Sequence, residues 1–507
     1  MTSKDYFEYL WEWLSLNQLG EVAVMSPHVI QARRKENELG YISKLPEELL
    51  YQIFWQYREL CRKKGSMEWA RVARVCHTWR DVAIKSTNLW NEVPIHNLKR
   101  VQELLSRSGQ APLVISSSKN SRGQDHKDHS IAFELVCEEL YRVRELELTV
   151  PAILFPLLLE ARKKSSAREL TYIDLTIDGS VREISADNLL GSTGAPNLRS
   201  FKFASHGGVS WKSLATSLPN TLQELSITHT NRVPRRITEL LVVLKSFPTL
   251  VSLHLDGVLP VASLDDPPPI TLLSLTSISL CGTPVRSAAF LKHVRLPRVR
   301  SMQLRSVVTS PTGLGDLAPI LADRINDAGS PSDFVSFSYN ERTSVYDTDI
   351  RAWTTLGKSA HNLQSGARDF RMFITHQKHG ETLPAFVSAL PFRSVQSLYV
   401  FPGSRENSVV RHEDEQANWR TTFGNMKAVR TLNLHSRRKH ILPFVLADDE
   451  YPRHELIELG MISLRQGQLA KERMKERIAM AMLAGFFPHL QNLVVRGVSQ
   501  NLHGKAR

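Results

Sequence analysis

Several features that define common protein classes are missing from this chain of 507 residues. No run of residues approaches the roughly 18 apolar residues that a membrane-crossing helix needs. The first 30 residues lack a basic start followed by an apolar run, so we expect no secretory signal and a cytoplasmic or nuclear protein. The four cysteines form no Cys-x-x-Cys pair, which argues against a disulfide scaffold: Cys61, Cys76, Cys137 and Cys281.

Signatures of catalysis and metal binding are scarce as well. The chain has no G-x-S-x-G, H-E-x-x-H or G-x-x-x-x-G-K-[ST] segment. Cys76 stands among basic residues, but its surroundings are more typical of a small buried hydrophobe than of a nucleophile. His126 and His129 in the DHKDH segment have no partner ligands at a zinc-finger spacing, so a solvated loop is the favoured interpretation. We therefore expect no enzymatic activity, no cofactor and no metal ion.

The chain is basic, with a formal net charge of +13 and a pI near 9.6. Such a charge favours acidic partners, and nucleic acid is one of them. However, the basic residues form short clusters such as Arg33-Arg34-Lys35 and Arg437-Arg438-Lys439, without interleaved aromatic residues. A basic solvated surface is the preferred interpretation, and a nucleic-acid or chromatin-binding protein is kept as an alternative.

The most specific pattern begins at residue 42 with an amphipathic helix. Leu45-Pro46 precedes a helix whose apolar residues recur at helical spacing. Pro46 suits the first helical position, because its φ is already helical and it has no N–H to leave unpaired. Glu47 and Glu48 then lie at the positive end of the helix dipole. The apolar residues of this helix are Leu49, Leu50, Ile53, Phe54 and Tyr57.

A second apolar run follows a polar break at residues 62–66. It carries a Val-Cys-x-x-Trp phrase formed by Val75, Cys76 and Trp79, and it closes on Leu89-Trp90. In this order, the two segments resemble an F-box, in the variant common in basidiomycete fungi. The alternative is a generic helical hairpin with an apolar core.

The resemblance implies a substrate-receptor subunit. In F-box proteins the helices bind a small Skp-type adaptor that connects them to a cullin–RING ubiquitin ligase, and the C-terminal part holds a protein target. The rate gain then comes from proximity rather than from catalytic side chains. By match to the motif, the resemblance assigns either adaptor contact or the F-box core to nine residues: Leu45, Pro46, Leu49, Leu50, Ile53, Phe54, Val75, Cys76 and Trp79.

From about residue 140 a short phrase, apolar-x-x-apolar-x-apolar, recurs along the chain. Seven copies start at residues 143, 170, 198, 222, 250, 275 and 299, and fainter ones start at 334, 395, 429, 456 and 490. A period in the twenties is typical of leucine-rich repeats, which stack because no single repeat buries its own apolar face. We therefore expect an α/β fold: a small all-α F-box, then an irregular leucine-rich-repeat solenoid with a curved parallel sheet backed by helices.

One copy of the phrase predicts which side chains face a target. In residues 250–255 the strand period puts Leu253 and Leu255 inward and Ser252 and His254 outward. We expect Ser252 and His254 to line the concave face of the sheet and to contact a target protein. The Asn or Cys that well-formed repeats carry after the strand is absent, so we expect an irregular solenoid.

These patterns predict three parts: an N-terminal helical extension at 1–40, an F-box at 41–93 and a repeat solenoid at 94–507. The extension carries an apolar stripe that includes Tyr6 and Trp11. The polar segment 116–130 is predicted as a loop, and the basic amphipathic segment 468–483 as a solvent-facing helix rather than a membrane-bound one. A repeat scaffold that binds the adaptor without delivering substrates is the second alternative to a substrate receptor.

Overall fold

The computed structural model describes most residues between 40 and 436, and it divides into two compact units, Met1–Pro219 and Asn220–Arg507. The N-terminal apolar stripe, the phrase at residue 456 and the basic segment 468–483 lie outside the described residues. The described residues are 28, 31, 32, 34, 35, 40–62, 67–95, 97–117, 126–165, 167–181, 184–191, 194–207, 209–228, 236–260, 267–308, 312–327, 334–342, 347–354, 369–376, 383–401, 426–436 and 492–497.

The first compact unit starts with the predicted helical segment. Helix α3 follows Pro46 directly and carries two acidic residues in its first turn, as the helix dipole favours. It packs against η2 and α4, where the rings of Phe54 and Trp79 lie 5.1 Å apart. The rings of Trp69 and Trp90 lie 4.9 Å apart in the same core. The elements are η1 (Tyr41–Lys44), α3 (Glu47–Arg62), η2 (Glu68–Arg74), α4 (His77–Lys85) and η3 (Thr87–Trp90).

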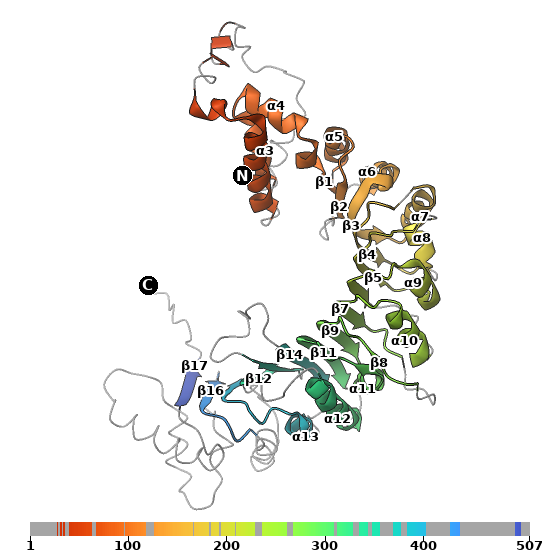
Figure 1. Cartoon of the computed structure of the whole chain (residues 1–507), viewed down its shortest axis with the longest axis vertical. Helices are drawn as coiled ribbons and strands as arrows, with labels where there is room; N and C mark the ends of the chain where they lie inside the picture. Colours follow the sequence, from red (N-terminus) through yellow and green to blue (C-terminus); the bar gives the residue numbers. More distant parts are fainter. Residues whose placement is uncertain are drawn as a thin grey trace, which may run out of the picture. The chain divides into compact units, whose positions relative to one another are not determined.

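A parallel sheet follows in the same unit. Its five strands pair in chain order: β1 (Glu92–Ile95), β2 (Leu113–Ser117), β3 (Val143–Pro151), β4 (Tyr172–Asp178) and β5 (Ser200–Ser205). The intervening helices lie on one side of these strands (Figure 1): α5 (Leu98–Ser108), α6 (His126–Glu138), η4 (Leu140–Arg142), α7 (Phe155–Lys164), α8 (Ala186–Leu190) and α9 (Trp211–Ser217). The predicted loop 116–130 is wrong at both ends, because β2 reaches Ser117 and α6 begins at His126.

The second compact unit holds a larger sheet whose strand order is β6-β7-β9-β11-β14-β13-β12-β15-β16-β17. Strands β8 (Ile270–Thr271) and β10 (Val294–Arg295) form a separate parallel pair. The strands of the large sheet are β6 (Glu224–Thr228), β7 (Ser252–Asp256), β9 (Ser277–Gly282), β11 (Ser301–Val308), β12 (Ser336–Arg342), β13 (Asp347–Trp353), β14 (Asp369–His376), β15 (Ser397–Phe401), β16 (Thr431–Ser436) and β17 (Asn492–Gly497). The helices are α10 (Ile237–Lys245), α11 (Pro284–Lys292), α12 (Thr312–Asp327) and α13 (Leu383–Ala389).

The predicted parallel sheet contains one antiparallel strand in this unit. Strand β13 runs antiparallel to both of its neighbours, β12 and β14. Strand β14, and not the next phrase strand β12, pairs with β11. The phrases at 334 and 395 are far apart, and the residues between them supply these two additional strands. Parallel pairing nevertheless dominates the sheet.

Polar side chains bind the backbone of a segment that lies one phrase earlier. Thr171 Oγ1 donates to the carbonyl of Arg144, 27 residues before it, and Thr249 Oγ1 donates to the carbonyl of Asn220, 29 residues before it. Asn197 and Ser274 make equivalent bonds at separations of 29 and 26 residues. The carbonyl of Arg144 also accepts from the backbone N–H of Thr171 at 2.8 Å. Short hydroxyl and amide side chains thus link the entry of one strand to the backbone at or before the start of the preceding strand.

A buried arginine joins helix ends in the first unit. Arg162, 2% exposed, donates to the carbonyls of Leu140 (3.2 Å), Leu189 (3.1 Å) and Leu190 (3.4 Å). Its burial lowers the pKa of the guanidinium to about 10. Because carbonyls at helix ends lack intrahelical partners, the guanidinium satisfies groups that would be costly to bury alone. No helix in the described part of the chain is long and apolar enough to cross a membrane.

Candidate functional site

Helix α3 carries two apolar rows that differ in exposure. Leu50 and Phe54 are 1% and 0% exposed and pack in the core between α3, η2 and α4. Leu49 and Ile53, one position earlier in each case, are 44% and 46% exposed. Residues three or four apart share a helix face, so each row is continuous along the helix. The inner row holds the fold together, and the outer row is available to a partner.

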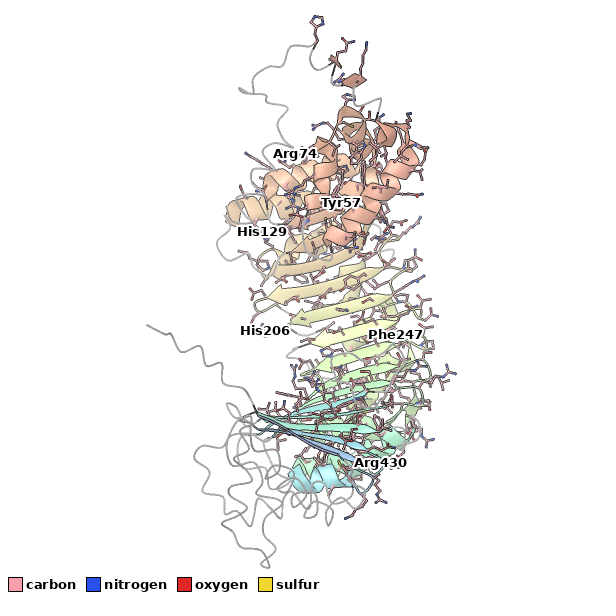
Figure 2. All side chains as sticks on the ribbon, turned by 90° about the vertical axis from the view of Figure 1, so that its left-hand side faces the viewer. Tyr57, Arg74, His129, His206, Phe247 and Arg430 are labelled. Carbon is pink, nitrogen blue, oxygen red and sulfur yellow. The ribbon has the colours of Figure 1, made fainter. Side chains whose placement is uncertain are left out.

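The outer row extends beyond the residues that the sequence motif singles out. Tyr57, which projects from α3 in Figure 2, is 36% exposed, and Leu60 is 60% exposed. Tyr57 already belongs to the apolar pattern of the sequence, and Leu60 continues that pattern at helical spacing, which is the signal that would have predicted Leu60. Together with Leu45 and the glutamines between them, these side chains line a groove of about 740 Å³. An apolar row of this length on a helix surface is typical of an interaction site.

The nine residues assigned by the motif fall into three groups. Leu50 and Phe54 belong to the core, so their expected contact with an adaptor is replaced by a structural role. Trp79 is half-buried because its ring packs on Phe54, and Leu45 and Cys76 are half-buried as well. The exposed members are Pro46, Leu49, Ile53 and Val75, the last of which is 58% exposed.

The reactive side chains considered in the sequence are dispersed. Cys76 lies at the N-cap of α4, and all four cysteines are free thiols. His77, its neighbour, is 3.2 Å from the carboxylate of Asp81. His129 lies on α6 rather than in the loop predicted for the DHKDH segment. Within the described ranges, no group of three or more His, Cys, Asp or Glu side chains is placed to hold a metal ion.

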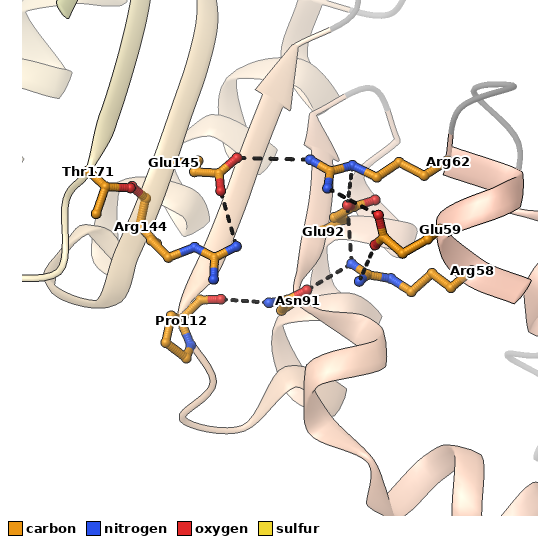
Figure 3. Close-up of polar contacts among 9 residues, drawn as sticks. All are labelled: Arg58, Glu59, Arg62, Asn91, Glu92, Pro112, Arg144, Glu145 and Thr171. Carbon is orange, nitrogen blue, oxygen red and sulfur yellow. Dashed lines mark hydrogen bonds and ion pairs between the residues drawn. The ribbon is translucent and has the colours of Figure 1, made fainter. Parts of the chain in front are cut away.

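Helix α3 is tied to the adjoining sheet by a buried arginine (Figure 3). Arg58, whose side chain is 2% exposed, donates from Nη2 to Asn91 Oδ1 at 2.8 Å and pairs with Glu92 at 3.2 Å. Asn91 Nδ2 in turn donates to the carbonyl of Pro112 at 2.8 Å. Burial lowers the pKa of the Arg58 guanidinium, and the carboxylate of Glu92 opposes this shift. The chain of bonds leads from α3 to the start of β2.

A second, more exposed arginine continues this connection. Arg62 Nε lies 2.7 Å from Glu92 on β1, and its Nη2 lies 3.9 Å from Glu145 on β3. Glu145 also pairs with Arg144 at 3.1 Å. Exposed ion pairs of this kind contribute little free energy, so the buried Arg58 is the main polar contact between α3 and the strands. We call Arg58, Arg62, Asn91 and Glu92 the α3–sheet network.

The residues predicted to contact a target lie on strand β7 of the second unit. Leu253 and Leu255 are 1% and 0% exposed, and Ser252 and His254 are half-buried on the opposite face of the strand. The alternation follows from the pleat, which turns successive side chains to opposite faces. Contact of Ser252 and His254 with a target stays a prediction.

The helical segment matches a known domain family. A family model described as F-box-like matches residues 42–95, from η1 through α3, η2, α4 and η3 to the end of β1. No curated protein matches the chain. The matched range contains the exposed apolar row and all four residues of the α3–sheet network. Residues 42–95 are therefore an F-box-like domain, followed by a mixed α/β region with a sheet in which parallel strands dominate.

Proposed function

We propose that this protein is the substrate-receptor subunit of a cullin–RING ubiquitin ligase. An F-box-like domain implies a Skp-type adaptor as its partner, and the observation that carries the proposal is the exposed apolar row of α3 within that domain. The protein contributes no catalytic residue in this proposal. It acts by holding a target close to the ubiquitin-conjugating enzyme, in the cytoplasm or the nucleus.

The adaptor contacts the outer row of α3 and the neighbouring exposed residues. Leu49, Ile53, Tyr57 and Leu60 form one face, and Val75 adds an apolar side chain at the start of α4. Their burial against a partner removes apolar area from water, which is the main driving force of association. Leu50 and Phe54 act indirectly, because they hold α3 against η2 and α4.

The region after residue 95 is the target-binding part. The spacing of its strands and the bonds from Thr171 and Thr249 to carbonyls one phrase earlier support an irregular leucine-rich-repeat solenoid. The target contacts the sheet face opposite the helices, where Ser252 and His254 lie. The α3–sheet network keeps the first strands at a fixed angle to the adaptor-binding helix.

The experiment separates a receptor from a scaffold. Tagged full-length protein and an Ile53→Asp variant are purified from cells with and without proteasome inhibition, and bound proteins are identified by mass spectrometry. Val242→Asp on α10 is the control, because Val242 is also exposed (62%) but lies outside the F-box-like domain. We expect Ile53→Asp to lose the adaptor and cullin while it keeps its targets, whose half-lives then lengthen.

Two outcomes would contradict the proposal. Unchanged half-lives of the bound proteins in the Ile53→Asp cells would make the protein a scaffold that binds the adaptor without delivering substrates. Bound material that is released by nuclease, with binding that falls steeply as salt rises, would support the nucleic-acid alternative, since phosphate contacts release counterions.

A further inference from the structure

A single cross-strand row of side chains runs over the second unit's sheet, on the face opposite the buried apolar residues. The strand register places His254 of β7 in line with Arg371 of β14, Arg351 of β13 and Tyr399 of β15. On β11, the two sides of the sheet differ clearly, because Met302 and Leu304 are buried and Gln303 is exposed. The complete row is His254, Ser279, Gln303, Arg371, Arg351, Ser338 and Tyr399.

The row has the dimensions of an extended peptide. It crosses seven strands, from β7 through β9, β11, β14, β13 and β12 to β15. At about 4.8 Å between neighbouring strands, the six intervals span about 29 Å, the length of roughly nine extended residues. Ser338 is short and borders Arg351 directly, whereas the exposed Gln303 lies between Arg371 and the short Ser279.

The two central arginines have donors to spare. Arg351 Nη2 lies 2.9 Å and Arg371 Nη2 lies 3.1 Å from Asp349 Oδ2, and the Nε of each arginine also points to this carboxylate. Burial by itself would raise the pKa of Asp349, but these hydrogen bonds outweigh burial and hold the pKa below its ordinary value. Among the described residues, the Nη1 group of neither arginine makes a hydrogen bond. The side chain of Arg371 is 37% exposed and that of Arg351 is 19% exposed.

The charged groups around the arginines differ in exposure. Arg305 is exposed on β11, next to the residue pair Gln303–Arg371. Three guanidinium groups (Arg305, Arg351 and Arg371) share this face with three carboxylates, those of Asp256, Asp349 and Asp369. Asp256 and Asp349 are only 8% and 3% exposed, whereas Arg305 and Arg371 reach the solvent. The exposed charge is therefore positive, and a guanidinium edge with free N–H donors binds a carboxylate in a strong, charge-assisted arrangement.

An aromatic pair borders the arginines. The rings of Trp353 and Tyr399 lie 5.7 Å apart, and Trp353 is 2% exposed. The indole Nε1 of Trp353 is buried and has no hydrogen-bond partner in the described part of the sheet. Arginine and aromatic side chains are the residue types that dominate binding energy at protein interfaces. Their combination favours a peptide that carries an apolar side chain next to an acidic one.

We propose that this row binds an extended acidic segment of the target protein. One Asp or Glu carboxylate of the segment binds the Nη1 edges of Arg351 and Arg371, and an adjacent apolar side chain packs on Tyr399. The inference rests on the proposed function, because it assumes that this sheet holds the target, and it adds the chemistry of the segment that is recognised.

The test uses the immobilised full-length chain and a nonapeptide library, and capture of the adaptor by the same chain is measured separately. The central residue of the peptides is glutamate, glutamine, lysine or phosphoserine, and the flanking positions are mixed. Peptides retained by the immobilised chain are counted. We expect the glutamate pool to be enriched about tenfold over the glutamine and lysine pools, and Arg371→Gln to remove the preference.

Two further variants keep the result interpretable. Arg305→Glu reverses an exposed charge at a residue that does not bind Asp349, and it should reduce the preference for glutamate. This variant tests the site even if Arg371→Gln unfolds the sheet. Arg298→Glu makes the same change at an exposed residue outside the row and should leave the preference intact. Equal retention of glutamate and glutamine, an equal loss with Arg298→Glu, or a preference for phosphoserine over glutamate would each overturn the inference.

The outcome for the peptide is independent of the outcome for the adaptor. A chain that captures the adaptor but shows no preference for glutamate would refute the acidic-segment inference and leave the proposed function in place. A chain that prefers glutamate but cannot capture the adaptor would refute the proposed function and keep the peptide-binding row.

Discussion

Arg58 Nη2 on helix α3 and Asn91 Oδ1 just before strand β1 are joined by a hydrogen bond of 2.8 Å, with both side chains buried. The bond connects two residues 33 positions apart, one in the helix with the exposed apolar row and one at the entry to the sheet. It makes the position of α3 depend on the entry to the sheet. In the proposed receptor such a connection is required, because the proposed contribution of the protein is the placement of a target.

Removal of the Arg58 guanidinium is expected to destabilise the first unit. Arg58→Leu leaves Asn91 Oδ1 without its donor in a buried site, and we expect the free energy of unfolding to fall by about 1–3 kcal/mol. Arg62→Gln is the control, since the Arg62 side chain is 44% exposed and its loss should cost less than about 1 kcal/mol. Denaturant unfolding followed by tryptophan fluorescence measures both. An equal cost for the two variants would show that burial of the Arg58 contact has no special role.

Substitutions on strand β7 test its two faces. Leu253→Ala removes a side chain that is 1% exposed, and we expect it to cost roughly 2–5 kcal/mol. Ser252→Ala, on the opposite face, should change the free energy of unfolding by less than about 0.5 kcal/mol. Thermal and denaturant unfolding give both values. If the two changes destabilised the chain equally, the strand would be buried on both faces and target binding there would have to be abandoned.

Two fully buried serines should respond in opposite ways. Ser306 on β11 is 0% exposed, and its Oγ has no hydrogen-bond partner within the described sheet, so Ser306→Ala should leave stability unchanged or raise it by up to about 1 kcal/mol. Ser108 on α5 is also 0% exposed, but its Oγ accepts from Arg142 Nη1 at 3.2 Å. Ser108→Ala should therefore cost about 1–2 kcal/mol. The reverse order of the two unfolding free energies would contradict this assignment.

Alkaline pH should destabilise the protein partly through Cys137. Burial, followed by the charges of Glu134 and Glu138, raises the pKa of this thiol from 9.0 to about 12. As the pH rises, the unfolded chain therefore loses the thiol proton before the folded chain does. The contribution of Cys137 to the free energy of unfolding is complete below pH 9 and is lost between pH 9 and 12, up to about 4 kcal/mol. The stability difference between wild type and Cys137→Ala should shrink as the pH rises from 8 to 11. A stability difference between the two proteins that does not change with pH would contradict the raised pKa of Cys137.

The strands are the part of the fold that the sequence predicts best. Each phrase that falls within the described residues precedes or enters a strand, as Leu250 precedes β7 and Leu275 precedes β9. The reason is that apolar residues two positions apart point to the same face of a strand. Strand β13 was not predicted, since it carries Asp349 and Arg351 and lacks the phrase. Its antiparallel pairing depends on β12 and β14, and such tertiary partners are invisible in a local pattern.

The sequence predicted the residues of the proposed adaptor-binding surface only together with residues of the core. Leu49 and Leu50 are identical in hydrophobicity, and Ile53 and Phe54 are similar, so periodicity identifies two rows without showing which one is covered. The packing of Trp79 on Phe54 decides this. The role of Arg58 could not be predicted, because a lone arginine in an amphipathic helix is usually solvated.

The measurement that tests the account most directly is the affinity of the full-length chain for a Skp-type adaptor. Titration calorimetry compares the wild type with Leu49→Asp, Ile53→Asp and the control Val242→Asp. Each aspartate on α3 would bury an unpaired charge in the interface, so we expect both α3 variants to bind roughly a hundredfold more weakly, and the control to bind within about twofold of the wild type. Circular dichroism checks that all four proteins are folded. Wild-type affinity in folded Ile53→Asp and Leu49→Asp would show that the exposed row of α3 is not the adaptor-binding surface.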